Sequence, residues 1–152
     1  MPKIEVRPAV PDDAPALCDV NIRSIREICA PDYPPERVET WCANKVPANY
    51  LKWLADPKLR LYTGLLEGRI AGVALLDING WVFLMYVAPE ALGQGLGKAM
   101  LHRLEDDARA LGLTQLQLKS TITARAFYER QGYANLGPTQ DEIPSFRMEK
   151  PL

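Results

Sequence analysis

A glycine-rich loop that opens a helix is the segment of this sequence best suited to bind a phosphate. The loop Leu92–Lys98 reads LGQGLGK and follows an apolar, strand-like run. Backbone N–H groups and the dipole at a helix N-terminus attract anions, and glycines let a ligand approach the main chain closely. A Walker A loop would need a serine or threonine where Ala99 stands, and a dinucleotide fingerprint would need a third glycine in place of Lys98. The loop therefore fits neither motif and is only a GxGxG sequence. Its glycines could also serve a tight turn from a strand into a helix, without binding a phosphate.

A second motif follows about 30 residues downstream, where Ala124–Tyr133 reads ARAFYERQGY. Together the two segments resemble the signatures of the GNAT superfamily of N-acetyltransferases. The loop is similar to its pyrophosphate motif, (Arg/Gln)-x-x-Gly-x-(Gly/Ala), and the second segment to Asn-x-x-Ala-x-x-(Phe/Leu)-Tyr-x-x-x-Gly-(Phe/Tyr). The chain departs from these patterns at Leu92, where arginine or glutamine is usual, and at Thr121, where asparagine is common. The resemblance extends over Ile4–Glu149.

The resemblance implies an α/β (α+β) fold and acetyl-CoA as the co-substrate. Its sheet would be mixed, mostly antiparallel and splayed between the fourth and fifth strands, with helices on both faces. Pantetheine would pair with the backbone of the fourth strand, loop amides and a lysine would hold the pyrophosphate, and the second motif would form the far wall. The implied cofactor-binding residues are Met85, Val87, Gly93, Gln94, Gly95, Leu96, Gly97, Lys98, Thr121, Ala124, Phe127 and Tyr128.

The chemistry of acetyl transfer to an amine needs a polarised carbonyl, a deprotonated amine and an acid for the departing thiolate. By resemblance, the N–H of Val87 polarises the carbonyl and the hydroxyl of Tyr128 is the acid. A phenol with its ordinary pKa of about 10 stays protonated at neutral pH. No general base carries over, because Trp81 falls near the position where some relatives have a glutamate. Asp77, Asp32 and a water molecule stay open as proton acceptors.

The acceptor site is expected in the region between the first helices, where the family builds its variable pocket. Asp32, Tyr33 and Trp41 would suit a cationic amine there, although ordinary helix packing would also explain the two aromatics. We therefore predict an acetyl-CoA-dependent N-acetyltransferase that acts on a primary amine of a small molecule by direct attack in a ternary complex. Acetylation of a protein N-terminus or lysine, and a non-catalytic acyl-CoA-binding module of the same fold, stay open as alternatives. A homodimer also stays open.

The spacing of apolar residues predicts the elements that would position this chemistry. Three strands in the middle of the chain should form an antiparallel meander whose apolar middle strand needs cover on both faces. The dipeptide Asn79-Gly80 in this meander predicts a type I′ turn. The predicted strands are Ile4–Arg7, Leu59–Leu66, Arg69–Ile78, Trp81–Val87, Gln115–Leu118, Tyr133–Leu136 and Phe146–Glu149. The predicted helices run from the cap at Asp12 to about Cys29 and over Glu36–Asn44, Ala48–Ala55, Leu96–Leu111 and Thr123–Gln131.

The composition agrees with one soluble, cytoplasmic domain over residues 1–152, 47% hydrophobic and 24% charged. Lysine and arginine number 18 against 19 aspartates and glutamates, so there is no basic field to attract nucleic acid or an anionic membrane. No apolar run approaches the roughly 20 residues of a membrane helix, and Met1–Ala9 has no signal-peptide core. The cysteines Cys18, Cys29 and Cys42 form no metal-binding motif and are expected to be reduced.

Overall fold

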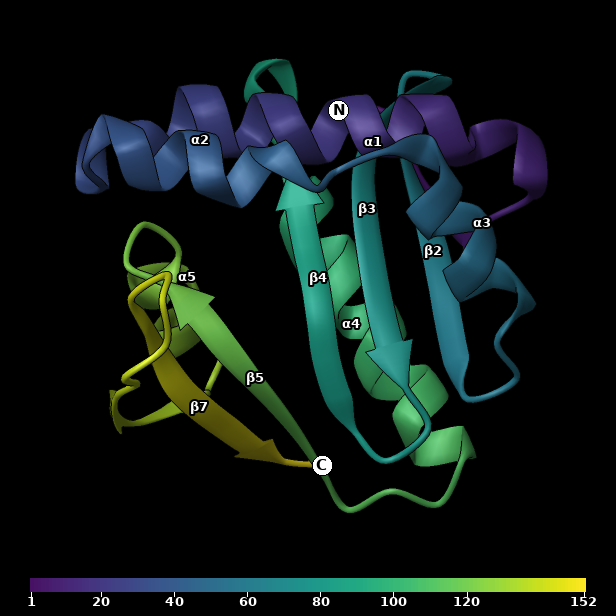
Figure 1. Cartoon of the computed structure of the whole chain (residues 1–152). Helices are drawn as coiled ribbons and strands as arrows, with labels where there is room; N and C mark the ends of the chain where they lie inside the picture. The colour runs from purple at the N-terminus through teal and green to yellow at the C-terminus, as the bar shows by residue number, and fades with distance from the viewer.

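A seven-stranded sheet with the order β1-β2-β3-β4-β5-β7-β6 forms the frame of the molecule in the computed structural model, which describes residues 1–152 (Figure 1). All neighbouring strands are antiparallel except β4 and β5, which are parallel. The predicted mixed, mostly antiparallel sheet is therefore confirmed. The strands are β1 Ile4–Pro8, β2 Leu59–Leu66, β3 Arg69–Asp77, β4 Trp81–Val87, β5 Gln115–Thr121, β6 Ala134–Pro138 and β7 Ser145–Pro151.

The sheet splays between β4 and β5. These strands pair only at their start, where Trp81 faces Gln117 and Val82 faces Leu118. Just beyond, the register of β3 with β4 shifts and leaves Phe83 as an extra residue in β4. A bulge of this kind bends its strand and increases the local twist. Figure 1 shows the two strands diverging from there towards the α1–α2 side.

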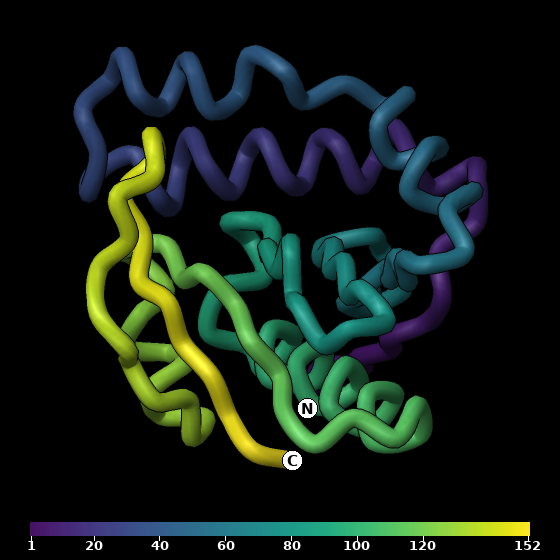
Figure 2. Tube along the Cα trace, turned by 60° about the horizontal axis from the view of Figure 1, so that its bottom comes forward, coloured from purple at the N-terminus to yellow at the C-terminus, as the bar shows by residue number.

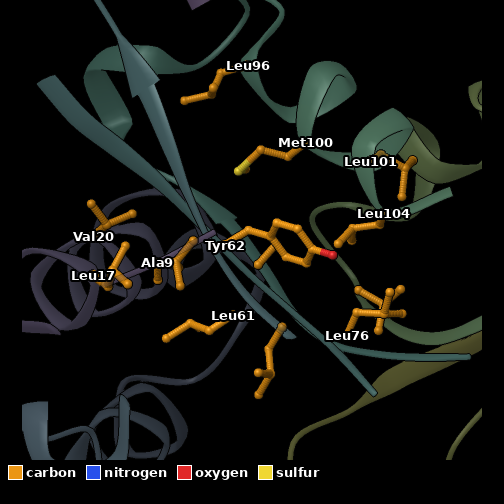
Figure 3. Packing of buried hydrophobic residues seen from close by; sticks show 14 of the residues in the cluster. Ala9, Leu17, Val20, Leu61, Tyr62, Leu76, Leu96, Met100, Leu101 and Leu104 are labelled. Atoms are coloured by element: carbon orange, nitrogen blue, oxygen red, sulfur yellow. The ribbon is translucent and has the colours of Figure 1, made fainter. Parts of the chain in front are cut away.

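Helices cover both faces of the larger half of the sheet. Figure 3 shows Leu17 and Val20 of α1 on one side of the strands and the α4 residues Leu96, Met100 and Leu104 on the other. All residues of β3 from 71 to 76 are buried, as expected for a strand covered twice. The helices are α1 Ala14–Arg23, α2 Pro35–Ala43, α3 Pro47–Ala55, α4 Leu96–Ala110 and α5 Arg125–Arg130. No helix is both long and apolar enough to cross a membrane.

The helix α4 lies unusually close to the sheet over a pair of glycines. Gly64 on β2 and Gly72 on β3 face each other across the strands. A Cβ atom built on either glycine would lie 2.8 or 2.7 Å from the sulfur of Met100. Real Cβ atoms do not approach so closely, so a side chain at either position would displace the end of Met100. The glycine pair thereby makes room for Met100 between α4 and the sheet.

The first helix is not the continuous α-helix predicted as far as Cys29. α1 ends at Arg23, a π-helix spans Ser24–Cys29, and a 3-10 turn covers Ala30–Asp32. Apolar spacing does not reveal such a change, because the buried residues Ile25 and Cys29 are four positions apart, which also fits an ordinary α-helix. Single turns of π-helix occur frequently at functional sites. In Figure 2 this segment leads into the turn after which α2 runs back beside α1.

The turns of the meander also differ from expectation. The predicted type I′ turn at Asn79-Gly80 is wrong, because Asn79 does not have a positive φ. The carboxylate of Asp77 instead accepts hydrogen bonds from the amides of Asn79, at 2.8 Å, and Trp81, at 3.2 Å. Two consecutive positive φ angles, the mark of a type I′ turn, occur at Glu67 (51°) and Gly68 (77°).

The strand β5 continues three residues beyond its predicted end at Leu118. Lys119, Ser120 and Thr121 pair with the first residues of β7. Hydrogen bonding to β7 therefore extends a strand that the local sequence would stop earlier. As a result, α5 begins at Arg125, and Thr121 lies at the end of a strand.

The connection from β1 to α1 is fixed by a buried carboxylate. Asp13 accepts hydrogen bonds from Arg7 at 2.7 Å, the amide of Val10 at 2.9 Å and the hydroxyl of Thr63 at 2.8 Å. These donors favour the charged form, and Arg7 contributes most, so the pKa of Asp13 is lowered to about 2. The network holds the start of α1 against β1 and β2.

We expect Asp13→Asn to lower the free energy of unfolding by about 1 to 2 kcal/mol at pH 7, since Arg7 is partly exposed and screened by water. A carboxylate with a lowered folded-state pKa stabilises the fold above its unfolded pKa of about 4, and this contribution disappears as the pH falls towards 2. Urea denaturation of both proteins at pH 7 and pH 3 measures the effect. A difference of the same size at both pH values would contradict the assigned pKa.

Candidate active site

A cavity of about 460 Å³ opens between the diverging strands β4 and β5. Its walls come from five segments that are distant in the sequence: the π-helix, β4, the glycine loop with the start of α4, the end of β5, and α5. Most of the lining residues are apolar. The splay of the sheet thus converts a packed interior into a binding site.

The wall formed by β4 offers unpaired backbone groups. Ala88 donates its amide to Ala71 on β3, at 2.7 Å. Backbone groups of an antiparallel strand point alternately to either side, so those of Val87 and Met85 point away from β3. β5 no longer pairs with β4 at this level. The N–H and C=O groups of these two residues are therefore free to bind a ligand.

The glycine loop presents a group of free amides at the N-terminus of α4. Gly93 and Gly95 have φ angles of 77° and 92°, which favour glycine, whereas Gly97 has an ordinary φ. The amides that donate to no group of the protein are those of Gly93, Gly95, Leu96, Gly97 and Lys98. The amide of Gln94 is already bound to the carbonyl of Ala91, at 3.3 Å. Such free N–H groups at a helix N-terminus are suited to a phosphate.

Ten of the twelve predicted cofactor residues line the cavity. They are Met85, Val87, Gly93, Gly95, Gly97, Lys98, Thr121, Ala124, Phe127 and Tyr128. The side chain of Gln94 lies elsewhere and donates to the carbonyl of Glu90 at 2.7 Å. The side chain of Leu96 is buried in the core above the glycine pair Gly64–Gly72. Leu96 can therefore contribute only its backbone amide, and Gln94 has no free amide to offer.

Two tyrosines bring hydroxyl groups into the cavity. Tyr128 on α5 is buried, packs edge-on against Tyr133, and its hydroxyl has no hydrogen-bond partner in the protein. Tyr86 on β4 also lines the cavity, and its hydroxyl is likewise unpartnered. Burial raises the pKa of both phenols, so both remain protonated at neutral pH. Either hydroxyl can donate a proton or a hydrogen bond to a ligand.

Comparison with known proteins agrees with this geometry. Residues 29–152 match the family model described as an acetyltransferase (GNAT) domain. The chain is 37% identical over 113 residues to a protein from Azospirillum brasilense described as an IAA acetyltransferase, a match that covers 67% of this chain and 74% of the relative. The chain belongs to the GNAT acetyltransferase family. It is therefore an acyltransferase that uses acetyl-CoA as co-substrate, as predicted.

Solved structures of other GNAT proteins share the fold of this acetyltransferase. A GCN5-related N-acetyltransferase from Rhodopseudomonas palustris superposes with a TM-score of 0.89 and 25% identity, covering 97% of this chain and 95% of its own. The PaiA N-acetyltransferase from Thermoplasma acidophilum, solved in complex with coenzyme A, gives a TM-score of 0.86 at 21% identity, with 99% of both chains covered. The second likeness supports the fold alone.

The predicted acceptor residues do not line the cavity of this acetyltransferase. The exposed Asp32 reaches it only indirectly, by accepting a hydrogen bond from Thr123 at 2.6 Å. Tyr33 is buried, donates its hydroxyl to the carbonyl of Pro144 at 2.7 Å and accepts from the amide of Ile122 at 2.9 Å. Trp41 packs edge-on against Tyr33, with ring centres 5.2 Å apart. Tyr33 thus ties the helices to β5 and the loop before β7, which differs from the predicted acceptor contact.

The sequence missed the residues that the π-helix brings into the cavity. They are Ser24, Ile28 and Cys29. Cys29 is a buried free thiol, like Cys18 and Cys42, and burial raises its pKa to about 11, so it is a poor nucleophile at neutral pH. The family motifs give no signal for these positions, because the π-helix belongs to the variable N-terminal region. Lys119, one residue beyond the predicted end of its strand, was also missed. Arg130 lines the cavity as well and belongs to the second motif, Ala124–Tyr133.

The contrast between two tyrosines gives a direct test of these placements. We expect Tyr33→Phe to lower the free energy of unfolding by about 1 to 3 kcal/mol, since it leaves the amide of Ile122 and the carbonyl of Pro144 without their partner. Tyr128→Phe is the matched control and should cost much less, because its hydroxyl bonds to no protein group. Urea denaturation measures both. Equal losses would contradict the role of Tyr33 as a tie between elements.

Proposed function

We propose that this acetyltransferase transfers the acetyl group of acetyl-CoA to a primary amine of a small molecule by direct attack in a ternary complex. The observation that carries the proposal is one continuous cavity with unpaired backbone amides at one end and an unpartnered tyrosine hydroxyl on its wall. The similarity to a protein described as an IAA acetyltransferase supports an acceptor of small size.

The residues present fit acetyl-CoA. The free amides of the loop and the start of α4, with the side chain of Lys98, would hold the pyrophosphate, and Lys98 forms no ion pair that would compete. The free backbone groups of Met85 and Val87 would pair with the pantetheine amides. Thr121, Ala124 and Phe127 would form the opposite wall. When bound, the co-substrate supplies the thioester from which the acetyl group is transferred.

Two groups of this chain would act on the reacting atoms. The amide of Val87 would donate to the carbonyl oxygen, where negative charge develops during attack. Tyr128 would donate its proton to the sulfur as the C–S bond breaks, and its raised pKa keeps that proton in place at neutral pH. Because both groups are fixed by the sheet and by α5, they need little rearrangement to act.

The experiment that tests the proposal measures the release of free CoA when the protein is incubated with acetyl-CoA and a panel of small amines. Release that depends on an amine, together with the acetylated product by mass spectrometry, supports it. Tight binding of acetyl-CoA without release by any amine, peptide N-terminus or lysine peptide would indicate the non-catalytic module. Turnover with peptides alone would indicate a protein acceptor.

The loop assignment can be tested with two glycines at opposite ends of α4. Gly95 and Gly112 have φ angles of 92° and 82°, so an alanine at either position strains the backbone. Only Gly95 lies at the cavity. We expect both Gly95→Ala and Gly112→Ala to lower the melting temperature by a few degrees, whereas only Gly95→Ala raises the Kd for acetyl-CoA, by about tenfold, because it reorients the loop amides.

Calorimetric titration of both variants provides the comparison. An unchanged Kd in folded Gly95→Ala, or equal weakening in Gly112→Ala, would exclude the loop as the pyrophosphate site.

The assignment of the acid can be tested with the two cavity tyrosines. We expect Tyr128→Phe to keep the Kd for acetyl-CoA and to lower kcat on the order of 10²-fold, the low end for the loss of acid catalysis. Tyr86→Phe removes the other free hydroxyl and should lower kcat far less. Steady-state kinetics with a responsive amine decides between them. If Tyr86→Phe gave the larger loss, the acid would belong to β4 and not to α5.

A further inference from the structure

The charges around the cavity are of one sign. No aspartate, glutamate or histidine lines it. The titratable and charged side chains that face it are Cys29 from the π-helix, Tyr86 from β4, Lys98 from α4, Lys119 from β5, and Tyr128 and Arg130 from α5. The only histidine, His102, is exposed on α4 and lies outside the lining. The cavity therefore contains cations and neutral donors but no anion.

Two carboxylates outside the lining are bound to side chains of residues that line the cavity. Asp32 accepts a hydrogen bond from Thr123 at 2.6 Å, and Asp141 forms an ion pair with Lys119 at 2.9 Å. Both aspartates are exposed to solvent and outside the lining. Neither is among the residues that line the cavity, so neither is placed there as a partner for an ammonium group.

This distribution of charge disfavours a charged acceptor. Moving an ammonium ion from water into an apolar cavity has a large energetic cost unless an anion or several acceptors replace the water. The charged residues of the lining, Lys98, Lys119 and Arg130, are all cations and offer no anionic partner to an ammonium group. A neutral amine avoids this cost, and its lone pair is already available for attack.

The apolar walls indicate the body of such an amine. Ile28, Phe83, Met85 and Tyr86 line the cavity. Phe83 is the bulged residue of β4 and is 53% exposed. Bulges often redirect a side chain next to an active site, and an exposed ring can stack on an aromatic ligand.

We infer that the acceptor binds as the uncharged amine and that it is a weakly basic aromatic amine. This inference rests on the proposed function and names its substrate class. Amines attached directly to an aromatic ring are neutral at pH 7, because their lone pair is delocalised into the ring. An alkyl amine with a pKa of about 10 is neutral in only about one molecule in 10³ at that pH.

The proton balance of the step is complete without a general base. The nitrogen lone pair forms the N–C bond as the C–S bond breaks, and the sulfur takes a proton from Tyr128. The nitrogen, which is acidic once it is acylated, releases its extra proton to water, and Tyr128 regains one from water. The products are the neutral amide and the free thiol of CoA.

The first test compares the pH dependence of kcat/KM for aniline and benzylamine, which differ by one methylene but strongly in basicity. Between pH 6 and pH 9 we expect a flat profile for aniline. For benzylamine we expect a rise of about tenfold per pH unit, because only its neutral form is used. A benzylamine profile that levels off near neutral pH would overturn the inference, since it would show that an enzyme group deprotonates a bound ammonium.

If the benzylamine profile does level off, the variant Asp32→Asn tests whether Asp32 is the group that deprotonates the bound ammonium. Loss of the plateau in Asp32→Asn would assign the proton acceptor to Asp32 acting through Thr123. Under our inference, Asp32→Asn leaves both pH profiles unchanged in shape.

The second test measures binding without turnover. The acceptors are titrated calorimetrically into the complex with CoA at pH 7, in two buffers with different enthalpies of ionisation. We expect benzylamine to release about one proton per molecule bound and aniline to release none, because both bind in the neutral form. Binding of benzylamine without proton release, or binding of a cationic diamine but of neither probe, would overturn the inference.

The aromatic contact has its own variant. We expect Phe83→Ala to weaken the binding of aniline to the CoA complex several-fold while the Kd for acetyl-CoA changes little. Unchanged binding of aniline would remove Phe83 from the acceptor site. Failure of the proposed function is distinguishable from all of these outcomes, because it would appear as a lack of acetyl-CoA binding or of any amine-dependent release of CoA.

Discussion

The incomplete pairing of β4 with β5 is the constraint on which the rest of the site depends. Only two residue pairs join these parallel strands, and the bulge at Phe83 follows immediately on β4. A fully paired sheet would satisfy the backbone groups of Met85 and Val87 and fill the space between the strands. Because the pairing stops, a hydrogen-bonding edge lies inside the protein, where a ligand can complete it. An exposed edge would attract other strands, whereas this one is covered by the π-helix, α5 and the glycine loop.

A second close contact brings the helix dipole to that edge. The glycine pair Gly64–Gly72 leaves room for Met100 and Leu96 of α4 to pack directly on the strands. A methyl group on either glycine would push against both side chains, and Leu96 is the first residue of α4, where the free amides lie. Binding chemistry at the cavity is therefore set partly by residues that never touch a ligand.

The sequence was most informative where chemistry is encoded by adjacent residues. The motifs of the glycine loop and of the segment around Tyr128 each lie within a few positions, so both segments could be predicted to share one site, and both line the cavity. The acceptor region could not be placed in this way. A run such as Asp32-Tyr33 shows which side chains are present but not where they point, and Tyr33 points into a small core with Ile25 and Val38. The same limit applies to Asn79-Gly80, where the Asp77 carboxylate overrides a strong local preference for another turn.

Because of the π-helix at Ser24–Cys29, the shape of the cavity depends on the number of residues in this segment as well as on their types. In an α-helix each residue turns the chain by about 100°, so one residue more or fewer rotates everything that follows by that angle. The wider turns of the π-helix over Ser24–Cys29 determine which of its residues reach the cavity, and these are Ser24, Ile28 and Cys29. A one-residue insertion or deletion in this segment would therefore change which side chains line this wall, without altering the glycine loop or β4. A comparison of sequences that scores only substitutions would overlook such a change in the shape of the cavity.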